Sequence, residues 1–187
     1  MYEIHDNNDI KIIKLGKSTK EVRAKLEYIR ERFKLQFKGT ADLSLQEICE
    51  ISGLPLDYAV RMVQREYGET ILQIEKRDMA KFVQVSKKVG LNLIHGGRFF
   101  DVTIGNDKGH AVQIVMDLFK RKYGTDIVFF GLGDSENDIS MLNLMDQPIL
   151  VQRNDNTWLN FKIKNVIKVQ GIGPIGWMNG FKIIDSR

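Results

Sequence analysis

The sequence predicts an α/β protein in which a segment of mixed strands and helices precedes a segment built on a parallel sheet. Strand-like and helix-like segments alternate from about residue 91 onward, as they do in successive β-α-β units. Within this part, the run Ile127–Phe130 is continuously apolar, which is typical of a central parallel strand covered on both faces. We therefore predict an α+β domain over residues 1–90 and a parallel-sheet domain over residues 91–187.

The first domain is predicted to begin with a strand at residues 3–15, where apolar and polar residues alternate before an apolar run. Two helices follow, because Ser18 and Ser44 each stand three residues before a glutamate that can complete a capping box. The remaining predicted elements are a helix over residues 56–69 that starts just after Pro55, a strand over 69–75, and a helix over 78–90 that ends at Gly90.

The second domain is predicted to begin with two strands joined at a glycine turn, "LNLIHGG" and "RFFDVTIG". An amphipathic helix follows and ends at Gly124. The elements predicted after it are a strand over residues 126–134, a helix over 135–145, strands over 147–152 and 165–171, and a last helix that starts near residue 173.

The composition is that of a globular protein, with 43% hydrophobic and 28% charged residues and a net charge of +4. The chain has no dense run of lysine or arginine interleaved with aromatic residues, so we predict no nucleic-acid partner. A small anionic ligand fits this mild positive charge equally well.

Cysteine usage and hydropathy indicate a cytoplasmic location. The only cysteine, Cys49, lies in a predicted helix and has no partner for a disulfide, which favours a reducing compartment and a packing role. No apolar run approaches the length of a membrane span, and the first residues lack the layout of a signal peptide. We predict no contact with a membrane.

Two carboxylates follow the predicted central strand in "FFGLGDSENDISML", at Asp134 and Asp138. A dinucleotide-binding loop is excluded, because Glu136 stands where its third glycine is required. A calcium loop is also excluded, because the stretch lacks the central glycine and has Met145 at the position of the closing glutamate. An ordinary helix start explains Ser135 and Asp138 as a cap and a first-turn acid, but it does not explain Asp134.

Asp134 lies at the carboxyl end of a buried strand, where open α/β sheets bind their ligands. Magnesium binds one or two carboxylates in such places, keeps several waters and also binds substrate phosphate. A phosphate would need a nearby cation, and "GNDKG" places Lys108 at the start of a helix. A solvated lysine in a first turn is the plainer reading of Lys108, although a bound anion would favour its positive charge there.

The stretches "GNDKG" and "GDSEND" resemble the third and fourth motifs of the haloacid dehalogenase (HAD) phosphatase superfamily, in the type that carries a large inserted cap. The resemblance implies an HAD-like core over residues 91–187 and a cap domain over residues 1–90, with a short core-derived strand at its start. It implies that Lys108 holds the phosphate, that Asn137 lies beside it, and that Asp134 and Asp138 bind Mg²⁺ directly or through water.

Three further stretches are similar to the mannosyl-3-phosphoglycerate phosphatase branch, namely "QREYGET", "HGGRFFDVTIGNDKG" and "GIGPIGW". The similarity covers nearly all of the chain. It implies a phosphorylated small-molecule substrate whose glycerate and sugar contact residues of the first two stretches: Arg65, Glu66, Glu69, Gly96, Gly97 and Arg98. Without the resemblance, a salt-bridged helix end would be the preferred explanation of Arg65 and the two glutamates.

The family's reaction is phosphoryl transfer to an aspartate in an Asp-x-Asp stretch, followed by hydrolysis by water. No two aspartates in this chain are separated by one residue. We therefore expect the first two or three β-α units of the core, roughly 80 residues, to be missing. Their loss would leave an open sheet edge and exposed apolar surface, which the absent segment or self-association would cover.

Three hypotheses follow. The chain is part of a sugar-phosphoglycerate phosphatase whose nucleophile lies elsewhere, or it is a catalytically inactive protein that keeps the fold for binding or assembly. A third, weaker hypothesis is an intact enzyme that uses another carboxylate, such as Asp101 or Asp107.

Overall fold

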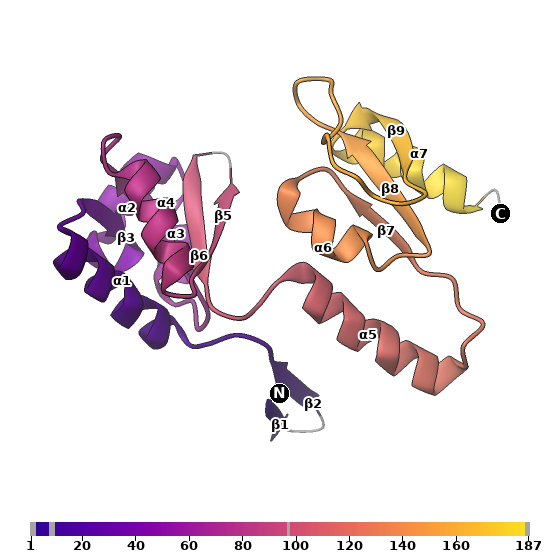
Figure 1. Ribbon diagram of the computed structural model, residues 1–187, viewed down its shortest axis with the longest axis horizontal. Helices are drawn as coiled ribbons and strands as arrows, with labels where there is room; N and C mark the ends of the chain where they lie inside the picture. Colours follow the sequence, from indigo (N-terminus) through magenta and orange to yellow (C-terminus); the bar gives the residue numbers. More distant parts are fainter. Residues whose placement is uncertain (1–2, 8–9, 97, 186–187) are drawn as a thin grey trace. The chain divides into compact units, whose positions relative to one another are not determined.

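The computed structural model describes residues 3–7, 10–96 and 98–185. The chain divides into two compact units, unit 1 (Met1–Asn106) and unit 2 (Asp107–Arg187), which are described separately (Figure 1). The division falls later than the boundary predicted at residue 90. The reason is that the strands after residue 90 form an antiparallel hairpin that hydrogen-bonds to the sheet of unit 1, so they do not belong to the parallel sheet.

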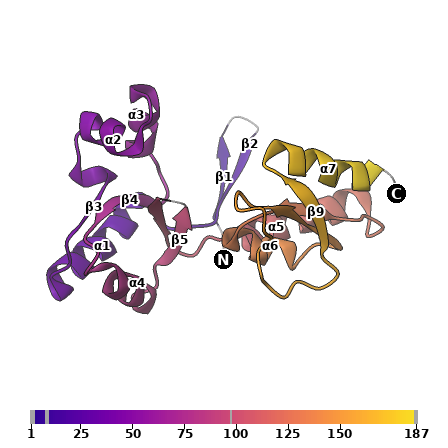
Figure 2. The same ribbon diagram turned by 90° about the horizontal axis from the view of Figure 1, so that it is seen from above.

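Unit 1 contains a four-stranded antiparallel sheet in the order β3-β4-β6-β5 and a separate hairpin, β1-β2 (Figure 2). Its elements are β1 (Glu3–Asn7), β2 (Ile10–Lys14), α1 (Thr19–Phe33), β3 (Phe37–Gly39), the 3₁₀ turn η1 (Thr40–Asp42), α2 (Leu45–Ser52), α3 (Leu56–Val63), β4 (Glu69–Ile74), α4 (Met79–Lys88), β5 (Asn92–Gly96) and β6 (Phe99–Thr103).

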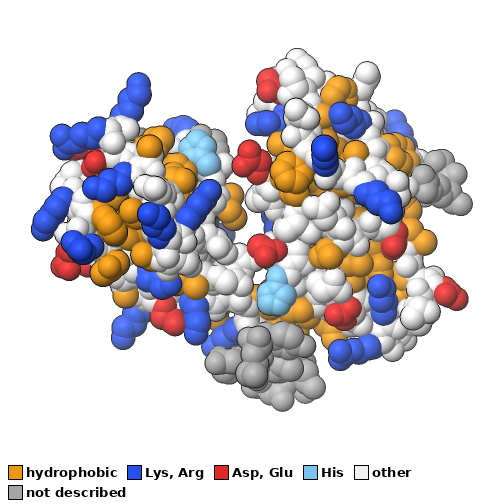
Figure 3. Space-filling view, in the orientation of Figure 1, with side chains coloured by type: hydrophobic (Ala, Val, Ile, Leu, Met, Phe, Trp, Pro, Cys, Tyr) orange, Lys and Arg blue, Asp and Glu red, His pale blue; other side chains and the backbone are white. Residues whose placement is uncertain are grey.

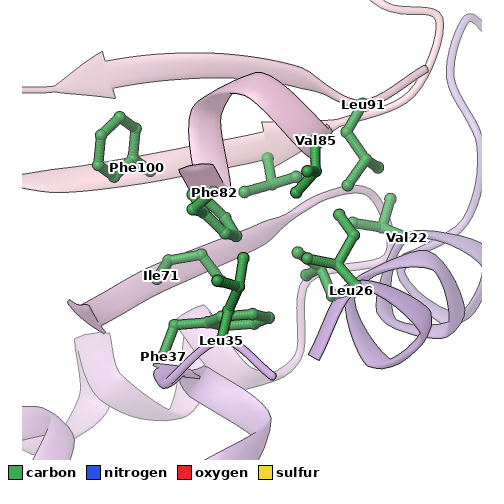
Figure 4. Packing of buried hydrophobic residues seen from close by; sticks show 11 residues of the cluster. Val22, Leu26, Leu35, Phe37, Ile71, Phe82, Val85, Leu91 and Phe100 are labelled. Carbon is green, nitrogen blue, oxygen red and sulfur yellow. The ribbon is translucent and has the colours of Figure 1, made fainter. Parts of the chain in front are cut away.

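Alternating residues of the sheet pack against different helices, because successive side chains of a strand point to opposite faces. Ile71 and Phe100 pack against α1 and α4 in the main core of this unit, where Phe82 lies between them (Figure 4). The neighbouring Leu72 and Phe99 pack against α2 and α3 on the other face. Unit 1 is therefore a sheet between two helical layers.

The predicted starts of α1 and α2 are confirmed, with capping boxes formed by Ser18 and by Ser44. The predicted strand at residues 3–15 is instead two paired strands. The helix predicted over 56–69 ends at Val63, and β3 was not predicted at all. β3 is only three residues long and is held by its pairing with β4, so its own pattern carries little signal.

Unit 2 is a three-stranded parallel sheet in the order β7-β8-β9, flanked by helices (Figure 1). Its elements are α5 (Lys108–Tyr123), β7 (Phe130–Gly133), the 3₁₀ turn η2 (Glu136–Asp138), α6 (Ile139–Leu142), β8 (Gln147–Gln152), β9 (Ile167–Ile172) and α7 (Pro174–Asp185). Ile149 and Val151 of β8 face α7, whereas Leu150 between them packs with Leu142 of α6. The predicted α/β class with a parallel sheet is confirmed.

Two elements of unit 2 are shorter than predicted. The strand expected over residues 126–134 begins only at Phe130, because pairing with β8 starts at Phe130 opposite Gln147. The helix expected over 135–145 is a 3₁₀ turn followed by one turn of α-helix. None of the helices in the described ranges is long and apolar enough to cross a bilayer.

Candidate functional site

Directly after β7 the chain makes a tight turn that contains the two aspartates singled out in the sequence analysis. Asp134 follows β7 directly, and Asp138 ends the 3₁₀ turn four residues later. Asp138 packs against the last residue of the strand, since a Cβ built on Gly133 would lie 2.5 Å from the Cβ of Asp138. A glycine at this position therefore allows the buried carboxylate to return beneath the strand end.

Asp138 is 4% exposed, and both of its oxygens accept hydrogen bonds. Oδ2 accepts from the backbone N–H groups of Asp134 and Ser135, each at 3.1 Å, and from the Ser135 hydroxyl at 2.9 Å. Oδ1 accepts from Nζ of Lys108 at 2.5 Å. Burial alone would raise the pKa of Asp138, but the hydrogen bonds from Lys108 and Ser135 hold that pKa below its usual range.

Lys108 is placed by the start of α5. Asp107 caps this helix by accepting a hydrogen bond from the His110 N–H at 2.9 Å. The next residue, Gly109, donates its N–H to the Ser140 hydroxyl at 3.1 Å. A Cβ on Gly109 would lie 2.8 Å from backbone atoms of Ser140, so α5 and α6 meet here more closely than a larger residue would permit.

An open cavity of about 330 Å³ lies over these groups. Its polar wall carries Lys108, Asp134, Ser135 and Asp138 beside the backbone of Gly133, and its apolar wall is made by Ala111, Val112, Leu132, Met141 and Trp177. Asn137 lies next to this wall, where its side-chain oxygen accepts a hydrogen bond from the Ser135 hydroxyl. The structure thus brings together the four residues predicted to bind the phosphate and the metal: Lys108, Asp134, Asn137 and Asp138.

The two carboxylates differ in what they could offer a metal ion. Asp134 is exposed, whereas both oxygens of Asp138 are already hydrogen-bonded. No cluster of three or more histidine, cysteine, aspartate or glutamate side chains with metal-binding geometry occurs among the residues that the structure describes. The donor set fits an ion such as Mg²⁺, which binds one or two carboxylates and keeps most of its waters.

Comparison with known proteins relates this chain to phosphatases. It is 36% identical over 167 residues to a glucosyl-3-phosphoglycerate/mannosyl-3-phosphoglycerate phosphatase of Persephonella marina, a match that covers 89% of this chain and 61% of the relative. It is 34% identical over 179 residues to the protein of the same name from Methanococcoides burtonii, covering 95% and 65%. No family model matches the chain.

The fold has relatives among solved structures. One is BT1666 of Bacteroides thetaiotaomicron, described as a phosphatase of the haloalkanoate (HAD) enzyme superfamily, with a TM-score of 0.57 and 17% identity over 95% of this chain and 68% of that one. The chain therefore shares the fold of this HAD phosphatase. It spans somewhat less than two thirds of the length of the two sequence relatives.

The residues that the resemblance implies for contact with substrate all lie in unit 1. Arg65 donates to Thr70 Oγ1 at 3.1 Å and to Asp101 Oδ1 at 2.9 Å, and Glu66 is exposed. Arg98 donates to the backbone oxygen of Ser52 at 2.5 Å. Gly96 is the last residue of β5, and Gly97 lies outside the described residues. Their predicted contacts with substrate remain predictions.

Glu69 differs from the other residues of this group because it is buried. It forms an ion pair with Nε of Arg23 at 2.5 Å, and its Oε1 accepts from the backbone N–H groups of Thr40 at 3.0 Å and Thr70 at 2.8 Å. These bonds hold α1, η1 and β4 together. The geometry therefore gives Glu69 a structural role in unit 1, whatever its role toward substrate.

Sequence reasoning missed the residues that position the site. Gly133, Gly109 and Ser140 create the close packing that sets the Lys108–Asp138 ion pair. Gly109 and Ser140 are 31 residues apart, so no local pattern connects them. The only available signal was that Gly133 and Gly109 adjoin the motif residues in sequence.

Proposed function

We propose that this chain is part of a magnesium-dependent phosphatase that hydrolyses mannosyl-3-phosphoglycerate, or a related sugar phosphoglycerate, to the sugar glycerate and phosphate. The observation that carries the proposal is the ion pair of Lys108 and Asp138 beside the exposed Asp134 in one open cavity. The sequence relatives, which are named as glucosyl-3-phosphoglycerate/mannosyl-3-phosphoglycerate phosphatases, support the substrate class.

In this proposal Lys108 supplies the positive charge that binds a phosphoryl oxygen. The ion pair with Asp138 holds the lysine at the mouth of the cavity and keeps its ammonium group oriented. Because the side chain of Lys108 is 50% exposed, it can bind a phosphate without leaving its carboxylate partner.

Asp134 would be the residue that holds Mg²⁺, with Asp138 fixing the backbone beneath it through two N–H bonds. When bound, the ion would neutralise charge on the phosphoryl oxygens. Asn137, oriented by Ser135, offers an amide N–H₂ for a further phosphate or substrate oxygen.

The nucleophile in this proposal is an aspartate outside the 187 residues, because the sequence has no two aspartates separated by one residue. That carboxylate attacks phosphorus, the bond from phosphorus to the glycerate oxygen breaks, and water then hydrolyses the acyl phosphate. The residues of unit 2 supply binding and electrostatic stabilisation for both steps.

The test is phosphate release from mannosyl-3-phosphoglycerate in the presence of Mg²⁺. The purified chain is assayed alone and together with the part of the Persephonella marina relative that lies outside its matched region. We expect release only in the mixture, and we expect its loss with Asp134→Asn in this chain. Release by the chain alone that disappears with Asp134→Asn would show that the nucleophile lies within the 187 residues.

The lack of an Asp-x-Asp stretch also supports a second candidate function, in which the protein binds a phosphorylated ligand without turnover. It predicts calorimetric binding of mannosyl-3-phosphoglycerate that depends on Lys108, with no phosphate release in either arm. Rescue of activity in the mixture would exclude it.

A further inference from the structure

The antiparallel sheet of unit 1 has two edge strands, β3 and β5 (Figure 1). The edge of a sheet presents unpaired backbone N–H and C=O groups, to which a strand of another chain can bind. Natural proteins protect such edges with charged residues, proline, bulges or very short strands. The two edges of this sheet differ in their protection, and the difference points to an interaction surface.

The β3 edge is protected in several ways. The strand has three residues, its register shifts between Lys38 and Gly39, and Lys38 adds a charge. Side chains also bind its backbone, because the N–H of Gly39 donates to Asp42 Oδ2 at 2.8 Å and Nη2 of Arg30 donates to the backbone oxygen of Phe37 at 3.5 Å. These bonds compete with any further strand at β3.

The β5 edge lacks such protection. Its sequence "NLIHG" contains no proline, lysine, arginine, aspartate or glutamate, and its five residues pair with β6 without a register shift. In the part of the chain that the structure describes, β6 is the only strand that pairs with β5, and no side chain bonds to the backbone of Asn92–His95. Asn92 and His95 are exposed, so the edge is regular and accessible.

The two apolar residues of β5 are only partly buried. Leu93 lies opposite Val102 of β6 and packs against the main core of unit 1. Ile94 lies opposite Asp101 and points to the other face of the sheet. The space-filling view shows hydrophobic side chains that reach the surface of unit 1 between basic ones (Figure 3). A strand beside β5 would cover the exposed parts of Leu93 and Ile94.

We propose that β5 is a dimerisation strand. The β5 strands of two copies pair antiparallel about a two-fold axis through Ile94, and two four-stranded sheets join into one continuous sheet. In this register Ile94 lies opposite Ile94 of the second copy, Leu93 lies opposite His95, and Asn92 lies opposite Gly96. An apolar pair therefore occupies the axis, and no like charges face each other, as stable cross-strand pairs require.

Symmetry and topology favour a second copy as the occupant of the β5 edge. The sheet of unit 1 is antiparallel, so an antiparallel β5–β5 pair continues its hydrogen-bonding pattern, and a two-fold interface closes at two copies. Pairing of β5 with β3 of another copy would instead form open chains of molecules, and the side chains bound to the β3 backbone oppose it. The interface lies in unit 1, so it does not depend on the proposed function of unit 2.

The oligomeric state of the full 187-residue chain tests the proposal. Sedimentation velocity at increasing concentration should show a monomer–dimer equilibrium. Hydrogen exchange of the amides of β5 should slow as the dimer forms. Pairing over five residues gives a small interface, so we expect the dimer to be weak and reversible.

Charge variants at the axis locate the interface. Ile94→Lys should weaken dimerisation by about tenfold or more, because it places two positive charges directly opposite each other. Ile94→Glu should have the same effect for the same reason. A mixture of the two variants should form the dimer again, since opposite charges then face each other at the axis. Mixing would not restore a dimer that was lost because unit 1 had unfolded.

Disulfide cross-linking tests the register. In a Cys49→Ser background, Ile94→Cys should form an intermolecular disulfide on mild oxidation, because directly opposite residues of an antiparallel pair lie within disulfide distance. Leu93→Cys is the matched control. Residue 93 lies opposite residue 95 of the second copy, so this variant should not cross-link.

Three results would overturn the proposal: a monomer at every concentration, a dimer that Ile94→Lys leaves unchanged, or equal cross-linking of Ile94→Cys and Leu93→Cys. Phe119→Ser separates this dimer from self-association through unit 2, because it removes an exposed ring from α5. It should leave the dimer unchanged. A dimer that is lost with Phe119→Ser but kept with Ile94→Lys would place the interface in unit 2 and contradict the proposal.

Discussion

Nζ of Lys108 lies 2.5 Å from Oδ1 of Asp138, while Oδ2 of the same carboxylate binds the backbone N–H of Asp134. One buried side chain thus joins the cation at the start of α5 to the backbone of Asp134 at the end of β7. The position of the lysine and the shape of the loop depend on the same group. A change at Asp138 should therefore affect folding, whereas a change at Asp134 should affect binding alone.

Asp138→Asn is expected to destabilise unit 2 by about 2 kcal/mol, because an amide replaces a carboxylate that accepts hydrogen bonds from a charged donor and two N–H groups. Asp134→Asn should change stability by less than about 0.5 kcal/mol, since Asp134 is exposed. Urea unfolding followed by tryptophan fluorescence measures this, because Trp158 and Trp177 both lie in unit 2. Equal losses of stability in the two variants would contradict the view that Asp138 supports folding and Asp134 supports binding.

Gly133→Ala should cost more stability than Gly131→Ala, although both glycines lie in β7. A Cβ at 133 meets the Cβ and Cγ of Asp138, which is held by its hydrogen bonds, so we expect a loss of about 2 kcal/mol. A Cβ at 131 meets the Cγ and Sδ of Met145, a flexible side chain that can move, and should cost about 1 kcal/mol or less. The same fluorescence assay compares them. A larger loss at 131 would show that Asp138 is free to shift.

The sequence predicted most elements because their signals are local. The capping boxes at Ser18 and Ser44 and the apolar pattern of β8 each depend on neighbouring residues. The structure divides into compact units after residue 106 and not after residue 90, because the pairing of a strand depends on tertiary contacts: the hairpin of β5 and β6 pairs with β4 instead of continuing the parallel sheet.

The candidate site shows the same contrast. Lys108, Asp134, Asn137 and Asp138 could be named because they lie in two short motifs. The sequence could not predict that Asp138 pairs with Lys108 and also accepts hydrogen bonds from the backbone of the loop. This arrangement depends on the contact between Gly109 and Ser140. Glu69 was predicted as a substrate residue, and its pairing with Arg23, 46 residues away, was not visible in the sequence.

Glu69→Gln is expected to destabilise unit 1 by about 3 kcal/mol. The buried carboxylate pairs with Arg23 and accepts two backbone N–H bonds, and the amide would turn a donor toward the guanidinium. Glu66→Gln is the matched control, because Glu66 is exposed and should lose less than about 0.5 kcal/mol. Hydrogen exchange of the amides of β4 measures the effect in unit 1 directly. If Glu69→Gln leaves this exchange unchanged, the ion pair does not stabilise the unit.

The start of α1 should make the stability of unit 1 depend on pH. The Glu21 carboxylate accepts hydrogen bonds from the Ser18 hydroxyl at 2.9 Å and the Ser18 N–H at 3.0 Å, and these bonds lower its pKa below 4.5. Because the folded pKa is the lower one, the ionised carboxylate stabilises the fold above pH 4.5, and this contribution disappears as the pH falls through the folded pKa. Glu21→Gln should therefore be less stable than the unchanged chain at neutral pH, and the difference should vanish in acid. Circular dichroism during urea unfolding at a series of pH values measures this difference in stability.

The control repeats the comparison of Glu21 with Glu21→Gln in a Ser18→Ala background, which removes the larger of the two hydrogen-bond contributions. The pH-dependent difference in stability should therefore shrink there, and a difference of unchanged size would assign the effect to another group.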